Sequence, residues 1–146
     1  MQKLELLLKR YAQHPHRVAR WWIGERPTAT EDVVWREIAG RVGYPTSSPD
    51  YFAGGLKPLS SRQAAHVLAV AGTTSLPYEN RAPSAAEVDH AAQALNELGA
   101  RFMFLSNGSW EPEQAMWTPL TTATFDCGLI GYDDEKAFIF WVEEED

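Results

Sequence analysis

Histidine and cysteine are the residue types in this chain that most readily bind a metal ion. His14 and His16 are separated by one residue, whereas His66, His90 and Cys127 lie far away along the chain. A zinc site needs three or four converging ligands, which usually come in closely spaced pairs. One local pair without nearby partners does not meet that requirement. We therefore expect no metal centre, and we place His14 and His16 at an exposed break between two helices.

Cys127 is also the one thiol that could act as a nucleophile. A reactive thiolate needs a neighbouring base or a helix N-terminus, whereas Cys127 lies inside a predicted strand, between Asp126 and Gly128. We expect a small buried side chain instead. The sequence has no motif for a serine nucleophile elbow, a phosphate-binding loop or a dinucleotide-binding site. Its twenty acidic residues are so many that a pair of catalytic carboxylates cannot be recognised among them. It thus indicates no cofactor and favours a protein without enzymatic activity.

The composition indicates one folded domain over residues 1–146. A hydrophobic fraction of 45% and six tryptophans are typical of a packed core. No apolar run is long enough to span a membrane, and the first residues do not resemble a signal peptide. A single cysteine leaves no internal disulfide. We therefore expect a cytoplasmic protein, and its net charge of −7 disfavours nucleic-acid binding as its main activity.

Charge is concentrated at the carboxyl end. Residues 133–146 contain seven acids and one base, whereas residues 1–42 contain eight bases and five acids. A solvated terminus would account for such a run. An acidic surface that meets a basic partner would also account for it, because a field of one sign accelerates encounter and fixes orientation.

The same region predicts a β-hairpin. Thr121–Tyr132 and Lys136–Val142 are rich in aromatic and β-branched residues, and the acidic stretch 133–136 between them is the natural turn. Both faces of Lys136–Val142 are apolar, so we expect a strand that is covered on both sides. If Asp133 faces Lys136, the register pairs Gly131 with Phe138, Ile130 with Ile139, Gly128 with Trp141 and Asp126 with Glu143. Directly opposed carboxylates are unfavourable, and a bulge at a glycine would shift this register.

The preceding chain predicts helices. The expected helices are Gln2–Ala12, a short one with Val18, Trp21 and Trp22, Thr28–Val42, and two that begin at Ser60 and Ser84. The last three have pairs with capping-box spacing, which are Thr28/Glu31, Ser60/Gln63 and Ser84/Glu87. Long loops are expected over Gly43–Leu59 and Thr73–Pro83, a strand over Arg101–Ser106, a hairpin turn at Asn107-Gly108 and one helical turn within Glu111–Trp117. The fold class is α+β, with N-terminal helices packed on a small C-terminal antiparallel sheet of three to four strands.

The end of the chain reads Gly-Leu-Ile-Gly-Tyr-Asp-Asp-Glu-Lys-Ala-Phe-Ile-Phe-Trp-Val-Glu-Glu-Glu-Asp over residues 128–146. It resembles the carboxyl ends of small acidic bacterial toxin-immunity proteins. The resemblance implies a cytosolic inhibitor that binds a cognate protein toxin, or another basic protein, and covers its active site. The predicted contact residues are Asp126, Asp133, Asp134, Glu135, Glu143, Glu144 and Glu145, with Trp110 or Trp141 as an anchor.

Two other classes of function stay open at this point. A small enzyme or ligand-binding domain would have a pocket between the sheet and the Gly43–Leu59 loop, lined by Tyr44, Tyr51 and a histidine. A regulatory subunit of a larger assembly would expose an apolar patch and form a stable homodimer. The sequence does not fix the oligomeric state.

Overall fold

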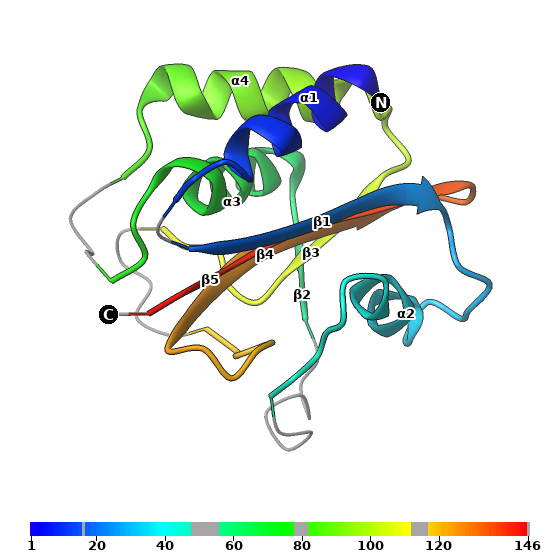
Figure 1. The fold of residues 1–146 in the computed structure, drawn as a ribbon. Coiled ribbons are helices and arrows are strands. Elements are labelled where there is room, and N and C mark those ends of the chain that lie inside the picture. The colour runs from blue at the N-terminus through cyan, green and yellow to red at the C-terminus, as the bar shows by residue number, and fades with distance from the viewer. Residues whose placement is uncertain (16, 48–55, 78–81, 112–116, 146) are drawn as a thin grey trace.

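The computed structural model describes residues 1–15, 17–47, 56–77, 82–111 and 117–145. Its elements are α1 (Gln2–Tyr11), β1 (Val18–Glu25), α2 (Val34–Gly40), β2 (Lys57–Leu59), α3 (Ser61–Thr73), α4 (Ala85–Asn96), β3 (Met103–Ser106), β4 (Phe125–Tyr132) and β5 (Lys136–Glu144). The described strands form one antiparallel sheet in the order β1-β5-β4-β3-β2. Helices α1, α3 and α4 cover one face of this sheet and α2 covers the other (Figure 1). None of these helices is long and apolar enough to cross a membrane.

The hairpin at the carboxyl end has the predicted register. Gly131 pairs with Phe138, Gly128 with Trp141 and Asp126 with Glu143. The two faces of β5 lie in separate apolar clusters. Phe138, Phe140 and Val142 pack beneath α1, α3 and α4, whereas Ala137, Ile139 and Trp141 pack against α2. The prediction of a strand covered on both sides is therefore confirmed.

Local capping signals correctly placed two of the helices. Ser60 and Gln63 form a reciprocal capping box at the start of α3, and Ser84 and Glu87 form another at the start of α4. Helix α1 also follows its prediction and buries the expected apolar stripe.

The expected helix around Val18, Trp21 and Trp22 is wrong, because these residues belong to strand β1. Val18–Glu25 pairs with β5 along its whole length. Trp21 packs on the cluster beneath α1, α3 and α4, whereas Trp22 packs on the α2 cluster. Successive side chains therefore serve opposite faces, as a strand requires. Together with the short β2, which lies in a predicted loop, β1 brings the described sheet to five strands rather than three or four.

The expected helix over Thr28–Val42 is shorter than predicted, since α2 begins only at Val34. Its predicted capping pair, Thr28 and Glu31, does not form the start of the helix. Glu31 instead lies beside Arg26 and accepts a hydrogen bond from the Tyr132 hydroxyl. Tertiary partners thus outcompete a local capping signal here.

The Asn107-Gly108 pair does not close a two-residue hairpin. The chain leaves β3 at Ser106 and reaches the paired strand β4 only at Phe125. Asn107 is 2% exposed, and its side-chain amide donates to the carbonyl oxygen and the carboxylate of Asp126. Most of the segment predicted to form a helical turn, Glu111–Trp117, lies outside the described residues.

Candidate functional site

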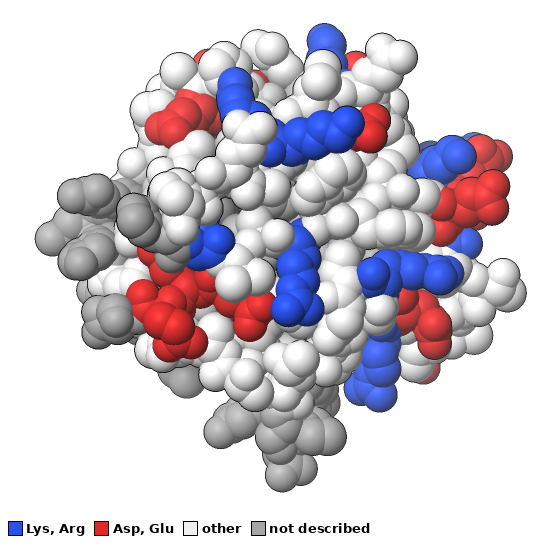
Figure 2. Space-filling view, viewed as in Figure 1, with Lys and Arg blue, Asp and Glu red and all other residues white. Residues whose placement is uncertain are grey.

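The predicted contact residues lie at opposite ends of the β4–β5 hairpin. Asp133, Asp134 and Glu135 form the turn, whereas Asp126 and residues 143–145 lie at the other end. At about 3.3 Å per residue, β5 separates the two groups by roughly 25 Å. Figure 2 accordingly shows acidic side chains in separate groups. The predicted contact residues therefore do not form one continuous acidic surface.

Asp126 is a buried structural carboxylate. Its exposed fraction is 0%, and it accepts hydrogen bonds from five donors. These are Asn107 Nδ2 at 2.9 Å, Trp141 Nε1 at 3.0 Å, the backbone N–H groups of Leu120 and Thr121 at 3.2 Å each, and Thr121 Oγ1 at 3.0 Å. Burial raises the pKa of Asp126, and these donors act in the opposite direction. The carboxylate thus ties the segment before β4 to the centre of the sheet.

Trp141 is also fully buried and donates to Asp126. Neither side chain can reach a partner in this fold, so the prediction of Asp126 and Trp141 as contact residues is corrected. Sequence reasoning missed the donors Asn107 and Thr121. The one available signal was the acidic residue placed directly opposite Glu143 in the predicted register.

The last glutamates are held by donors from the rest of the chain. Glu143 accepts a hydrogen bond from the Tyr44 hydroxyl at 2.6 Å, and burial together with this bond raises the pKa of Tyr44. Glu144 is 7% exposed and accepts from Ser75 Oγ at 2.8 Å and from the Leu76 N–H at 2.9 Å. Glu145 is exposed and accepts from the backbone N–H and hydroxyl of Thr124. These carboxylates mainly fasten the end of the hairpin.

Trp110 lies near that same end in a row of aromatic rings. Its ring centroid is 5.1 Å from that of Trp117, which in turn stacks on Phe125 at 5.7 Å. Trp110 Nε1 donates to Asn107 Oδ1, and its carbonyl oxygen lies 2.9 Å from His66 Nε2. Trp110 is only partly buried, so it stays available as a contact residue.

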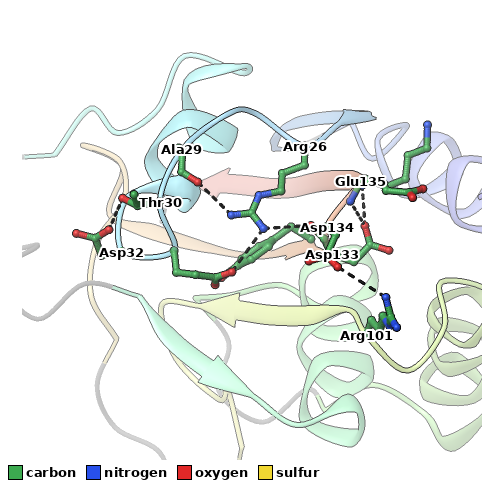
Figure 3. Close-up of polar contacts among 11 residues, drawn as sticks. Arg26, Ala29, Thr30, Asp32, Arg101, Asp133, Asp134 and Glu135 are labelled. Atoms are coloured by element: carbon green, nitrogen blue, oxygen red, sulfur yellow. Dashed lines mark hydrogen bonds and ion pairs between the residues drawn. The ribbon is translucent and has the colours of Figure 1, made fainter.

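The turn at the opposite end is built to hold its shape (Figure 3). Asp133 Oδ1 accepts from the backbone N–H groups of Glu135 and Lys136, at 2.8 and 2.7 Å. Arg26 lies against the turn and donates to the Asp133 and Ala29 carbonyl oxygens, at 3.4 and 3.1 Å. Sequence reasoning did not single out Arg26, because its partners come from a distant part of the chain.

Asp134 and Glu135 project from this turn into solvent. The side chain of Asp134 is 80% exposed and lies 3.7 Å from the equally open guanidinium of Arg101. An ion pair in such a position holds its partners only weakly. The side chains beside this turn include five carboxylates, those of Glu25, Glu31, Asp133, Asp134 and Glu135, and three basic groups, those of Arg26, Arg101 and Lys136. The turn is thus a small, rigid, acidic projection.

Among the described residues, the groups considered for metal or thiol chemistry do not assemble into a site. Within the described ranges, no three His, Cys, Asp or Glu side chains are placed to hold a metal ion. Cys127 is fully buried, and burial raises the pKa of its thiol. His16 lies outside the described residues, and His66 contacts the Trp110 carbonyl.

The residues predicted to line a ligand pocket are placed differently. Tyr44 is 3% exposed and packs in the α2 cluster, while Tyr51 lies outside the described residues. An open hollow of about 360 Å³ lies elsewhere, between α1 and α4. It is lined by Lys3, Leu6, Leu7, Arg10, His90, Gln93 and Ala94.

Comparisons with protein-family models, with curated proteins and with solved structures found no match.

Proposed function

We propose that the protein is a non-enzymatic inhibitor of the immunity-protein kind, which acts in the cytoplasm and binds a basic protein toxin through the turn of the β4–β5 hairpin. The observation that carries this proposal is the exposure of Asp134 and Glu135 on a turn that internal hydrogen bonds hold in place. Both carboxylates are available to a partner without disturbing the core.

Rigidity of the turn supports this function. Asp133 fixes the backbone from inside the turn and Arg26 supports it from outside. A segment that is already ordered loses little conformational freedom when it binds. A basic active-site cleft that receives such a projection would be closed to its own substrate.

The local charge supports the choice of partner. Five carboxylates against three bases give this end an excess of negative charge, and Asp134 and Glu135 are exposed there. Exposed charges of this kind mainly accelerate association with an oppositely charged surface. We therefore expect binding whose association rate falls steeply with added salt.

The test uses the protein encoded beside this chain in its genome of origin. Where that neighbour has a basic toxin domain, its association with the intact chain is measured by surface plasmon resonance at low and high ionic strength. The double variant D134K/E135K should associate at least about tenfold more slowly at low salt, and circular dichroism should show that it keeps the fold.

The matched control is E145K, which reverses the charge of an exposed glutamate at the far end of the hairpin. It should leave the association rate nearly unchanged. E145K changes the net charge by half as much as D134K/E135K does, so a slowing half as large on a logarithmic scale would show that only net charge matters. An unchanged rate in D134K/E135K would refute binding through the turn.

A further inference from the structure

Strand β1 leaves one long side of the sheet without a neighbouring strand in the described part of the chain. Its other side pairs with β5 from Val18 to Glu25 without interruption. Long exposed edges are usually protected by proline, lysine, a bulge or short length. The opposite edge strand, β2, is protected in this way, since it has three residues and contains Lys57 and Pro58. Strand β1 has eight residues and none of these features.

The backbone groups that face outward from β1 follow from the pairing pattern. The N–H of Arg26 donates to the carbonyl oxygen of Glu135, which is the next position in the β1–β5 register. Residues of an antiparallel strand direct their N–H and C=O groups alternately to either side. The groups of Ala19, Trp21, Ile23 and Glu25 therefore point away from β5 and toward the open edge.

The two faces beside this edge differ in chemistry. Ala19, Trp21 and Ile23 are partly buried and continue the apolar cluster beneath α1, α3 and α4. Arg20 and Trp22 point to the α2 face. The side chains of an added strand would thus contact an apolar strip on one face of the sheet and the surface around Arg20 and Trp22 on the other.

Two arginines on that second surface pack against aromatic rings, and Glu143 contacts Tyr44 on the same face. The Arg20 guanidinium lies 5.1 Å from the centre of the Tyr44 ring and donates to the Val42 carbonyl at 2.9 Å. The Arg41 guanidinium lies 5.4 Å from the centre of the Trp22 ring. Both arginines are nevertheless exposed. Figure 2 shows basic side chains on the side of the molecule where β1 and α2 face the viewer.

We propose that the open edge of β1 binds an extended segment of a partner protein in which acidic and apolar residues alternate, so that the segment adds a sixth strand to the sheet. Main-chain hydrogen bonds would provide affinity, and the alternating side chains would provide specificity. Acidic side chains on the α2 face would meet Arg20 and Arg41. Apolar side chains on the other face would cover Ala19, Trp21 and Ile23.

Charge favours this acidic segment over a second copy of the same chain as the partner of β1. Two copies of β1 paired about a twofold axis would place their α2 faces on the same side of a continuous sheet. The exposed Arg20 and Arg41 of both copies would then lie on one face, where like charges disfavour association. An acidic strand removes that repulsion, and so the observations favour it. This surface is distinct from the acidic turn, which would bind a basic partner.

The experiment uses the intact chain and short fluorescent peptides of alternating Glu and Val, with fluorescence anisotropy as the readout. Comparison peptides replace each Glu by Lys, or separate the same Glu and Val residues into two blocks. We expect the alternating acidic peptide to bind at least about tenfold more tightly than either comparison peptide. Equal binding of the Lys peptide, or no binding of the acidic one, overturns the proposal.

Two variants locate the binding to β1. A19P removes an outward N–H without removing a bond to β5, and R20E reverses the charge beside the edge. Each should weaken binding of the acidic peptide about tenfold or more, whereas R62E, an exposed arginine at the start of α3, should not. If A19P does not fold, R20E decides by itself. Unchanged binding in R20E refutes the proposal.

One further measurement separates this proposal from binding of a second copy. A homodimer of the wild-type chain in sedimentation experiments that is lost in R20E would assign the edge to a second copy and overturn the proposal.

Discussion

Removal of the Asp126 carboxylate should strongly destabilise the fold. D126A leaves five donors without their acceptor, and three of them have no freedom to turn elsewhere. These are the backbone N–H groups of Leu120 and Thr121 and the indole N–H of Trp141. Leu120, Thr121 and Trp141 are 0%, 2% and 0% exposed, so water does not replace the carboxylate.

The magnitude follows from these three donors. A buried donor without a partner costs about 1–3 kcal/mol, and loss of the buried charge returns part of that cost. We therefore expect D126A to lower the free energy of unfolding by about 3–4 kcal/mol. D126N keeps one acceptor oxygen but turns its amide toward the N–H of Thr121, and we expect a loss of about 1–2 kcal/mol.

The assay is urea unfolding, followed by circular dichroism and by tryptophan fluorescence. D134A is the matched control, because it removes an exposed carboxylate from the same hairpin, and it should change stability by less than about 0.5 kcal/mol. W141F tests the coupling, since its effect and that of D126A should not be additive. A loss below about 1 kcal/mol in D126A would refute the structural role argued for this carboxylate.

Two other perturbations test the packing. G128A should lower stability by about 3 kcal/mol, because its new Cβ would lie 2.2 Å from the Phe140 carbonyl oxygen. In G40A the new Cβ meets no atom within 4 Å, so this control should be neutral or slightly stabilising. Thermal melts compare the two variants, and equal melting temperatures would contradict the close approach at Gly128. Burial raises the pKa of Tyr11 from 10.0 to about 12, so the stability that depends on its neutral form should be lost as pH rises through that interval. Urea unfolding in this pH range should show a weaker pH dependence in Y11F, and an unchanged dependence would contradict the assignment.

The parts of the fold that could be predicted are those with local signals. The Asp133–Lys136 turn fixes the register of β4 and β5, and each glycine opposite a large ring is consistent with it. Capping boxes at Ser60 and Ser84 likewise lie within four residues of sequence. Such signals require no knowledge of what lies elsewhere in the fold.

Strand β1 could not be found in this way. Its residues 20–23 read Arg-Trp-Trp-Ile, and three large apolar side chains in succession have neither helical nor strand periodicity. They suit a strand only because each face of the sheet has its own core, one beneath α1, α3 and α4 and the other on α2. The pairing with β5, more than a hundred residues away, decides the conformation.

The contact surface could not be predicted correctly for a related reason. A run of acidic residues in the sequence does not show which carboxylates already accept hydrogen bonds within the fold. Tyr44, Ser75, Leu76 and Thr124 supply donors to the glutamates at the end of β5. These donors come from loops whose positions the sequence does not reveal. The acidic run therefore offers fewer carboxylates to a partner than its composition suggests.

The exposed carboxylates of the turn and the open edge of β1 are neighbours, because Glu25 at the end of β1 pairs with Lys136 at the start of β5. A strand added along β1 would therefore end beside Asp134 and Glu135. A partner that presents an acidic, apolar-alternating strand next to a basic patch would match both surfaces in one orientation only. Opposite charges in adjacent positions reject a partner that is shifted or reversed, because either change brings like charges together. Specificity of this kind arises from the arrangement of a few exposed residues, and the net charge of the chain does not determine it.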